Sequence, residues 1–497
     1  MDTEKYDVGL VTCGFAGNYG AVFTAYALYK TLQRNGYKTL FLDKPKFWWP
    51  DYYNNEKNLF TRNFLKKHIE YFSEEFGRED LNKLSNVCNQ FVVGSDQLWN
   101  YVVYNDSGHY LQLDFVKDKN KKISYATSFG HDILYVKGKE KHVLGSYLKR
   151  FDNISVREKS GVRILNEEFN INAKSVLDPV FLLSRSDYDD LAKESTLRLP
   201  KNYLFVYMLD SNQDKIYAIE KICKKRNLKK VLIVNDYDND KLEEGDILLR
   251  IGEASPEDFI FAIKNSKVVF TDSFHGTCFS LIYNKQFIAL KNKGRGQARF
   301  DDLFEFLELG DVGLSIEEFA YNGYEGKEVN YDSYQTMIKK LKEESLNWLL
   351  SALKEEKTTT IESEFYKEIA QLLPDIIEER RLLTSIGEVG LGEGVLIHEI
   401  VERMPNNSVL CQVQGRMGEP IIDTPEPYGV LTITKTTDYF VQILFSQMTL
   451  SAKKPQLFQA NWIKGDIRGW TRYVEESELK ELEERIKKLE KLNNKGE

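Results

Sequence analysis

Residues 6–37, YDVGLVTCGFAGNYGAVFTAYALYKTLQRNGY, decide the fold class of the N-terminal part of this chain. The apolar run at 6–14 predicts a β-strand, and the glycine-containing segment after it predicts a loop. From Val22 the apolar residues recur at helical spacing, and this amphipathic helix is expected to end near Gly36. KTLFLDKP then supplies a second strand. The stretch therefore predicts a βαβ unit, the building block of a parallel sheet.

The same alternation of apolar runs and charged helical stretches continues to about residue 180 and restarts near residue 202. Further strands are expected at 89–96, 121–130, 153–161, 173–183, 202–212, 229–236, 246–252, 267–273 and 285–291. This rhythm predicts an α/β fold with two Rossmann-like domains, 1–180 and 181–357, the second with closing helices. Two such sheets in tandem make a cleft between the carboxyl ends of their strands, so we expect a GT-B-like arrangement.

The pattern changes beyond residue 357. Residues 358–379 are expected to form a helical linker, and short β-like runs among Gly and Pro predict a smaller, mainly β module over 380–475. Residues 476–497 are expected to form a terminal helix, because their apolar residues alternate at spacings of three and four, as in a coiled coil. These residues are Leu479, Leu482, Ile486 and Leu489.

Composition and charge exclude several function classes. With 42% hydrophobic and 29% charged residues over 497 positions, the chain has the make-up of a folded globular protein of about three domains. The formal net charge of −8 argues against a nucleic-acid partner, since such binding needs clustered Lys and Arg. A small anionic substrate is still compatible, because a local basic pocket can form on an acidic protein.

Cysteine usage and hydropathy indicate a cytoplasmic protein. The five cysteines are odd in number, scattered and without a CxxC pair, so neither a disulfide framework nor a zinc ribbon is indicated. The first residues enter a strand at once, without the basic and apolar regions of a signal peptide. No window approaches the roughly 18 apolar residues of a membrane span, so at most peripheral membrane contact is expected.

Polar residues follow apolar strands directly in three segments, the position at which an α/β sheet presents side chains to its cleft. The segments are VVGSDQLWN at 92–100, ISVREKSG at 154–161 and VVFTDSFHGTCFSLIYNKQFIAL at 268–290. The basic stretch KNKGRGQARFDD follows the third.

Together with two further blocks, these segments resemble the polysaccharide pyruvyl transferase family. The resemblance rests on CGFAGNYGAVFTAYALYKTL, VVGSDQLWN, ISVREKSG, VLDPVFLL and FTDSFHGTCFSLIYNKQFIALKN. These blocks lie in that order and the likeness covers about residues 6–310. Five ordered blocks are specific, whereas FAGNYG alone is only a strand-to-helix glycine loop and not a GxGxxG fingerprint.

The resemblance implies a transfer of the carboxyethylidene unit of phosphoenolpyruvate to two hydroxyls of a sugar, with release of phosphate. The implied partners are phosphoenolpyruvate as donor and a glycan or lipid-linked oligosaccharide as acceptor, and no further cofactor is expected. The short coiled-coil pattern at 476–497 is compatible with a homo-oligomer. This chemistry needs a proton donor, a proton acceptor, and cations or amide dipoles that hold a carboxylate and a phosphate.

His275, Arg157 and Asp96 are the candidate catalytic residues. His275 suits a general acid or a phosphate contact, because its usual pKa is near neutrality and it follows a strand; the alternative is a structural histidine that closes the turn. Arg157 can grip a carboxylate or phosphate with its planar fork, or can pair with Glu158 or Asp178. Asp96 can act as a base or orient sugar hydroxyls, or can cap a helix beginning at Gln97.

Further substrate contacts are expected from residues beside these three. They are Asn18, Tyr19 and Gly20 in the first glycine loop, Ser95 and Gln97 beside Asp96, Ser273 beside His275, and Lys291, Lys293, Arg295 and Arg299 after the last strand of the second sheet. The loop amides lie at a helix N-terminus, where they can bind an anion or merely form a tight turn. Among the basic residues Arg299 is the first choice, since it is nearest a hydrophobic helix. A solvated basic loop is the alternative. Trp99 can stack on a sugar or belong to the core.

No metal site is expected, because the six histidines are scattered and no HExxH occurs.

Residues 380–475 are similar, more weakly, to the knob domains of phage and pyocin tail fibres. That resemblance implies binding of a glycan or a protein. The alternative is a β appendage that covers the cleft or a dimer contact. Two other functions are compatible with tandem α/β domains: a GT-B glycosyltransferase that uses a nucleotide sugar, and a non-catalytic glycan-binding protein of a surface or phage assembly.

Overall fold

The computed structural model describes most of residues 5–357 and six strands of the C-terminal part. The gaps within 5–357 are 44, 47–58, 78–79, 101–106, 108, 118, 236, 238, 292–297, 311 and 324. Beyond residue 357 the description is limited to 381–383, 408–414, 429–437, 440–447, 457–463 and 466–473. The chain divides into two compact units, residues 1–365 and 366–497. Each is considered by itself.

The first sheet has six parallel strands in the order β2-β1-β3-β4-β5-β6. The strands are β1 (Tyr6–Val11), β2 (Thr39–Phe41), β3 (Cys88–Val93), β4 (Lys121–Thr127), β5 (Asn153–Val156) and β6 (Lys174–Ser175). The accompanying helices are α1 (Tyr19–Arg34), α3 (Leu59–His68), α4 (Leu81–Val87), α6 (Gly138–Leu148) and α7 (Lys159–Phe169). Strand β2 lies on one side of β1, and β3 and the later strands lie on the other. The loops after β1 and β3 therefore run in opposite directions and leave a crevice at the carboxyl ends of these two strands.

The second sheet is also parallel and has the order β12-β11-β10-β7-β8-β9, so two strands, β8 and β9, lie on the far side of its first strand, where the first sheet has only β2. Its strands are β7 (Tyr203–Met208), β8 (Lys229–Val234), β9 (Ile247–Arg250), β10 (Val268–Thr271), β11 (Gln286–Leu290) and β12 (Gly313–Leu314). Its helices are α8 (Arg185–Ala192), α9 (Gln213–Arg226), α10 (Pro256–Asn265), α11 (Phe274–Ile282), α12 (Ala298–Phe306), α13 (Ile316–Tyr321) and α14 (Tyr331–Lys354). Strands β8 and β9 lie on one side of β7, and β10 to β12 lie on the other, so the crevice of this sheet lies between β7 and β10.

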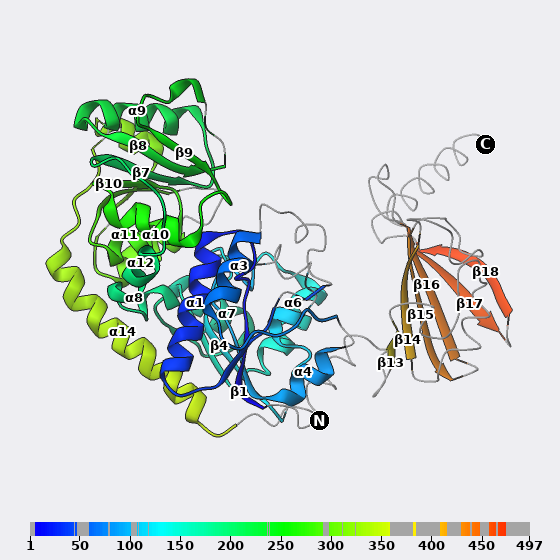
Figure 1. Ribbon diagram of the computed structural model, residues 1–497. Helices are drawn as coiled ribbons and strands as arrows, with labels where there is room; N and C mark the ends of the chain where they lie inside the picture. Colours follow the sequence, from blue (N-terminus) through cyan, green and yellow to red (C-terminus); the bar gives the residue numbers. More distant parts are fainter. Residues whose placement is uncertain are drawn as a thin grey trace, which may run out of the picture. The chain divides into compact units, whose positions relative to one another are not determined.

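A shared core of aromatic side chains joins the two sheets, and Figure 1 shows α1 of the first sheet lying beside α8, α10 and α11. Tyr19 on α1 stacks on Phe259 of α10, with ring centroids 4.9 Å apart. Phe23, one turn further along α1, meets Phe279 of α11 edge-on at 4.9 Å. Aromatic pairs of this kind add to the free energy of burial, so these contacts fix the orientation of one sheet relative to the other.

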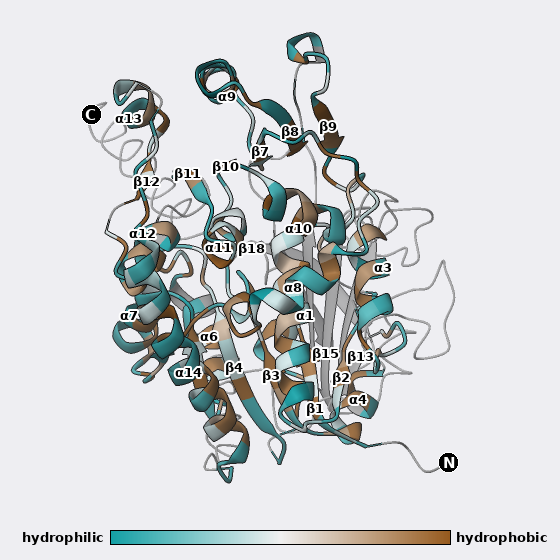
Figure 2. Ribbon diagram, turned by 60° about the vertical axis from the view of Figure 1, so that its left-hand side comes forward, coloured by the Kyte–Doolittle hydropathy of each residue, from teal (hydrophilic) through white to brown (hydrophobic). Residues whose placement is uncertain are grey.

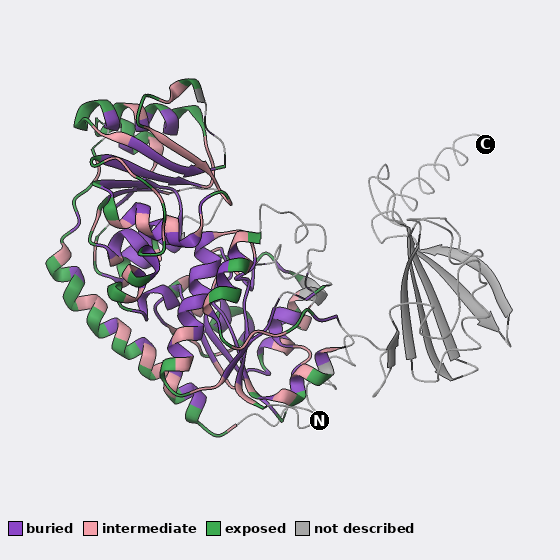
Figure 3. Cartoon of the chain, viewed as in Figure 1, coloured by how far each residue is buried: buried purple, intermediate pink, exposed green. Residues whose placement is uncertain are grey.

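Helix α14 runs back from the second sheet to the first, along the outside of the unit (Figure 1). Its apolar side is buried and its opposite side is exposed, which gives the alternating stripes along this helix in Figure 3. Its Ser345 hydroxyl accepts a hydrogen bond from the Leu177 amide, and its Lys342 ammonium donates to the Leu183 carbonyl. The helix therefore ties the end of the second sheet domain to the segment that links the two sheets. Figure 2 shows the hydrophobic residues of the unit concentrated in the strands and on the inner sides of the helices.

The second unit contains a six-stranded sheet in sequence order, β13 to β18, within the residues that the structure describes. The strands are β13 (Arg381–Leu383), β14 (Ser408–Gln414), β15 (Gly429–Thr437), β16 (Phe440–Gln447), β17 (Leu457–Ile463) and β18 (Asp466–Tyr473). Only β13 and β14 run parallel, and the other neighbours are antiparallel. A mainly β module was expected here and is confirmed. The expected linker at 358–379 and terminal helix at 476–497 lie outside the described residues.

The predicted α/β class with two Rossmann-like sheets is confirmed, and the main difference lies in the first helix. That helix begins at Tyr19, three residues before the expected start, because the Asn18 side chain caps it by accepting hydrogen bonds from the Gly20 and Ala21 amides. Among the described residues, none of the helices combines the length and the apolar content that crossing a bilayer requires.

Candidate active site

A cavity of about 190 Å³ lies where the crevices of the two sheets meet. The residues that line it come from the loops after β1, β3 and β4 of the first sheet and after β7, β10 and β11 of the second. They are Asn18, Asp96, Gln97, Asn100, His131, Leu209, Asp272, Ser273, Phe274, His275 and Arg299. Both topological switch points thus contribute to one site, which is the position expected for a ligand in open α/β sheets.

Arg157 lies behind the residues that line the cavity, and each nitrogen of its side chain contacts a carboxylate. Its side chain is 1% exposed, and its three nitrogens contact the carboxylates of Asp96 at 3.1 Å, Glu158 at 3.2 Å and Asp178 at 2.9 Å. The face of its guanidinium also lies 4.6 Å from the centroid of the Phe274 ring. Burial lowers the pKa of Arg157, but the three carboxylates outweigh it and raise that pKa, so the group stays charged. The arginine therefore holds other site residues and does not line the cavity itself.

Asp178 is the acidic group on which the buried contacts converge. Its Oδ2 atom accepts a hydrogen bond from Arg157 and lies 3.2 Å from the Ser95 hydroxyl and 3.5 Å from His275 Nε2. Its Oδ1 atom accepts from the Val180 amide at 3.1 Å. Burial alone raises the pKa of Asp178, but these donors more than offset it and hold the pKa at about 2. Asp178 is a carboxylate at every physiological pH.

Asp96 connects this buried network to the cavity. Its Oδ1 atom accepts hydrogen bonds from Arg157 at 3.1 Å and from the Gln97 amide at 2.9 Å. No helix begins at Gln97, where the chain instead forms a turn, so the contact is local and is not a helix cap. Burial raises the pKa of Asp96, whereas Arg157, His275 and Arg299 lower it, and the lowering effect wins. Asp96 is thus an ionised carboxylate at the cavity surface, able to accept a proton or a hydroxyl hydrogen bond.

His275 enters the cavity wall from the first turn of α11, two residues after the helix-capping residue Ser273. Its ring packs against the first turn of α1, because a methyl group built on Gly20 would lie 2.0 Å from His275 Nδ1. The other nitrogen, Nε2, is buried 3.5 Å from Asp178 Oδ2, at the outer limit of a hydrogen bond. The imidazole is therefore held between a helix N-terminus and a carboxylate, an arrangement that suits a residue which gains and loses a proton.

The side-chain charges around the cavity nearly cancel. Arg157, Arg299 and Lys215 are cations beside or behind the cavity, and Asp96, Asp178 and Asp272 are carboxylates there. Glu158 is a further acidic group, and burial raises its pKa. Lys215 neutralises Asp272 directly at 2.7 Å. The positive groups that face the cavity are Arg299 and the N-termini of α1 and α11, where partial positive charge can hold an anionic ligand.

The basic residues after β11 take different positions. Arg299 lies on α12, lines the cavity and is 8% exposed, with its guanidinium 5.9 Å from the Phe274 ring. Lys291 is not part of the lining, and its ammonium pairs with Asp301 at 2.5 Å. Lys293 and Arg295 lie outside the described residues.

The remaining expected contacts divide between the cavity and the core. Asn18, Gln97 and Ser273 line the cavity. Tyr19 does not, because its hydroxyl donates to the Ala254 carbonyl at 2.7 Å and its ring is wholly buried between the sheets. Ser95 is buried beside Asp178 and forms part of the wall behind the cavity.

Sequence reasoning missed several residues of the site. The expected site did not include His131, Asn100, Asp272, Phe274 or the central carboxylate Asp178. The signals were present for all of them. Asn100, Asp272 and Phe274 lie in the quoted segments 92–100 and 268–290, Asp178 lies in the quoted block VLDPVFLL, and His131 follows strand β4 in SFGHD. Trp99 is in the core, with 1% of its surface exposed and its indole N–H bonded to the Leu111 carbonyl.

The comparisons with known proteins agree with the sequence blocks. A family model described as polysaccharide pyruvyl transferase matches residues 18–294, more than half of the chain. No curated protein matches the chain.

Solved structures with a similar chain path include sugar-nucleotide enzymes. The UDP-N-acetylglucosamine 2-epimerase of Rickettsia bellii is 11% identical with a TM-score of 0.44, over 71% of this chain and 97% of that one. The epimerase of Neisseria meningitidis bound to UDP-GlcNAc is 11% identical with a TM-score of 0.42, over 74% and 98%. A glycosyltransferase from Rickettsia africae is 11% identical with a TM-score of 0.39, over 74% and 99%.

Proposed function

Because this chain belongs to the polysaccharide pyruvyl transferase family, we propose that it transfers the carboxyethylidene unit of phosphoenolpyruvate to two hydroxyls of a glycan or lipid-linked oligosaccharide. The product is a pyruvate ketal on the sugar, and phosphate is released. The cavity between the two sheets is the proposed place of this reaction.

One observation carries the proposal: an ionised carboxylate and a histidine from different sheets line the same small cavity. Asp96 follows β3 and His275 follows β10, and both lie next to the buried pair of Arg157 and Asp178. The reaction needs one group that donates a proton and one that accepts a proton, and these two side chains have those opposite properties.

The proposed chemistry balances as follows. Protonated His275 donates a proton to C3 of the enol, which leaves positive charge at C2. A sugar hydroxyl adds to C2 and gives its proton to Asp96. A second hydroxyl then adds to the same carbon as the C2–O bond to phosphate breaks, and its proton leaves with the phosphate. Asp96 then releases its proton and His275 takes one up, which restores both side chains. Over the whole cycle, the two protons lost by the hydroxyls equal the one gained by C3 and the one gained by phosphate.

Binding of the donor is assigned to the positive groups around the cavity. Arg299 and the N-termini of α1 and α11 all face it, and charge-assisted hydrogen bonds from such groups are stronger than neutral ones. Arg157 keeps Asp96 ionised and in place, since its own donors are directed at three carboxylates. The groups that would bind the donor are thus different from the arginine that holds the carboxylates. The site can therefore bind an anionic donor although its side-chain charges nearly cancel.

The test is phosphate release from phosphoenolpyruvate in the presence and absence of candidate galactoside acceptors. The wild type is expected to release phosphate only with an acceptor, and His275→Ala is expected to reduce that rate by about 100-fold or more, the usual effect of losing an acid–base group. His142→Ala serves as the matched control, because His142 is exposed on α6 and does not line the cavity.

Two results would count against the proposal. Turnover only with a nucleotide sugar would indicate a glycosyltransferase, and glycan binding without turnover in both wild type and variant would indicate a binding protein. If His275→Ala kept full activity with phosphoenolpyruvate, the proposed reaction would still hold, but His275 would not be its proton donor.

A further inference from the structure

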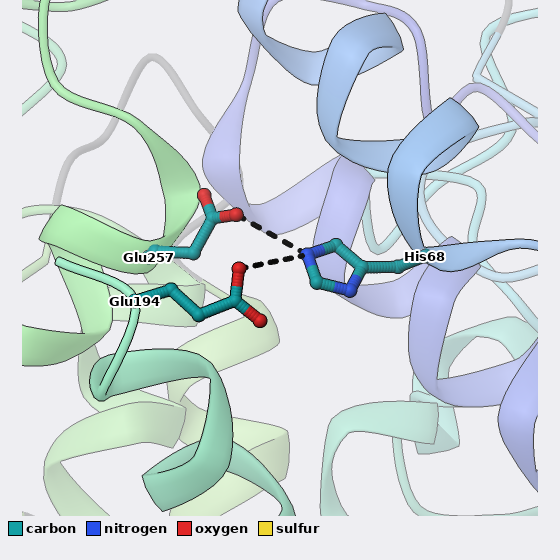
Figure 4. A group of neighbouring side chains, drawn as sticks. All are labelled: His68, Glu194 and Glu257. Atoms are coloured by element: carbon teal, nitrogen blue, oxygen red, sulfur yellow. Dashed lines mark hydrogen bonds and ion pairs between the residues drawn. The ribbon is translucent and has the colours of Figure 1, made fainter.

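A second cluster of chemically versatile side chains lies away from the cavity. His68 at the end of α3, Glu194 after α8 and Glu257 in the first turn of α10 direct one ligand atom each toward a common point (Figure 4). All three atoms lie within 4.8 Å of one another. His68 and Glu194 are 126 positions apart in the chain (194 − 68), and Glu194 and Glu257 are 63 apart (257 − 194). No short sequence motif can therefore contain all three residues.

From this arrangement we propose that His68, Glu194 and Glu257 form a binding site for a divalent transition metal such as Zn²⁺. One imidazole nitrogen and two carboxylate oxygens are the donor set that such borderline cations accept, whereas Mg²⁺ and Ca²⁺ prefer oxygen alone. The site is independent of the proposed transferase reaction.

The distances support this coordination. His68 Nε2 lies 3.2 Å from Glu257 Oε1 and 4.0 Å from Glu194 Oε2. In a tetrahedral site with bonds of about 2.0–2.1 Å, neighbouring ligand atoms are roughly 3.3 Å apart. The first pair is at this spacing already, and Glu194 needs only a small side-chain movement, which its partly exposed position allows.

Two of the ligands are held in position by their surroundings. The His68 ring packs 4.5 Å from Phe64 and 5.9 Å from Tyr26, which restricts its rotation. Glu257 is 5% exposed, and its Oε1 atom lies 3.2 Å from His68 Nε2. Its carboxylate is therefore held beside the imidazole by the packing of α10 against α3.

Lys67 is the group with which a metal competes. Its ammonium contacts both Glu194 and Glu257, the latter at 3.1 Å, but its side chain is 55% exposed and can turn into solvent. The two carboxylates and the Lys67 ammonium together carry a net charge of −1, and the two carboxylates alone carry −2 once Lys67 has moved away. A divalent cation neutralises the second state, and it then joins α3 of the first sheet domain to α10 of the second.

The experiment measures Zn²⁺ binding to the full-length protein by calorimetry and metal content after dialysis. Lys67→Met removes the competing ammonium and keeps all three ligands, so it is expected to bind one Zn²⁺ at least ten-fold more tightly than the wild type. His68→Ala is expected to lose this one Zn²⁺, and its melting temperature should no longer rise when Zn²⁺ is added.

Matched controls separate this site from other zinc-binding groups on the surface. Lys83→Met removes an exposed ammonium that pairs with Asp80, and His142→Ala removes an exposed imidazole; both are expected to bind Zn²⁺ like the wild type. The proposal is overturned if Lys67→Met and the wild type bind Zn²⁺ equally, or if His68→Ala keeps the same stoichiometry as the wild type.

Discussion

Arg157 could bind an anionic substrate by its chemistry, but in this protein its guanidinium is buried and holds neighbouring carboxylates. A planar guanidinium carries several donors at fixed angles, so one arginine can serve three carboxylates from three different segments. Here it contacts Asp96, Glu158 and Asp178, and the face of its guanidinium lies against Phe274. A lysine could not make this set of contacts, because its ammonium is a single point of charge.

Asp178 is expected to make stability depend on pH in the acidic range. Its pKa is about 2 in the folded protein, below its usual value of 3.8, so its contribution is fully present above about pH 4 and is lost as the pH falls through about 2. Asp178→Asn should lower the free energy of unfolding at pH 7 by about 2 kcal/mol, and the difference from wild type should shrink below pH 4. Urea denaturation at several pH values measures both effects.

Asp190→Asn provides the comparison for this substitution. Asp190 is 72% exposed and forms an ion pair with Lys193, three residues further along the chain. Such an exposed ion pair contributes little to stability. Its loss should change stability by less than about 1 kcal/mol at pH 7. A constant gap between Asp178→Asn and the wild type from pH 7 to pH 2 would contradict the assignment of a depressed pKa to Asp178.

At the scale of elements, the site depends on the meeting of two helix N-termini. Helix α1 begins after β1 and α11 begins after β10, and each is capped by the side chain of the preceding polar residue, Asn18 or Ser273. Glycine at position 20 allows the backbone of α1 to touch the His275 ring, where any side chain would collide. The two helices thereby bring residues that are 255 positions apart (275 − 20) into contact.

Gly20→Ala is expected to displace His275 without unfolding the protein. The added methyl group would lie 2.0 Å from Nδ1 and 2.5 Å from Cγ of the ring, so the imidazole must move. We expect at least a ten-fold loss of kcat in the phosphate-release assay, because catalytic geometry is lost with small displacements. Gly161→Ala on α7 is the control, since the three atoms nearest its methyl group would all belong to the Val156 side chain, the closest at 3.2 Å, and kcat should stay nearly unchanged. Equal activity of Gly20→Ala and wild type would show that the position of His275 is not critical.

At the scale of the whole molecule, the chain consists of two units with separate sheets. The α/β unit covers residues 1–365 and the β unit covers residues 366–497. Units with their own cores commonly unfold separately. Differential scanning calorimetry of the full-length protein should therefore show two transitions, and a chain that ends at residue 365 should keep one of them within a few degrees. A single transition that disappears on truncation would contradict this division.

The elements of the fold were largely predictable because their signals are local. Apolar runs identified nearly every strand of both parallel sheets, and polar residues at the strand ends identified Asp96 and His275, which line one cavity. The start of α1 was misplaced because the capping role of Asn18 was not recognised. Tyr19 shows the limit of such reasoning: its position in a glycine loop suggested a ligand contact, whereas its side chain packs in the core between the sheets.

The sequence by itself determined the α/β class, the two parallel sheets, the mainly β C-terminal unit and the family, because periodicity and ordered blocks are properties of neighbouring residues. Only the tertiary structure decided which side chains meet. The partners of Arg157, the position of Asp178 beside His275 and the grouping of His68 with Glu194 and Glu257 all depend on how two separately formed sheets pack together. That packing is set by the aromatic contacts of α1 with α10 and α11, which join residues too distant in the chain for any local pattern to relate them.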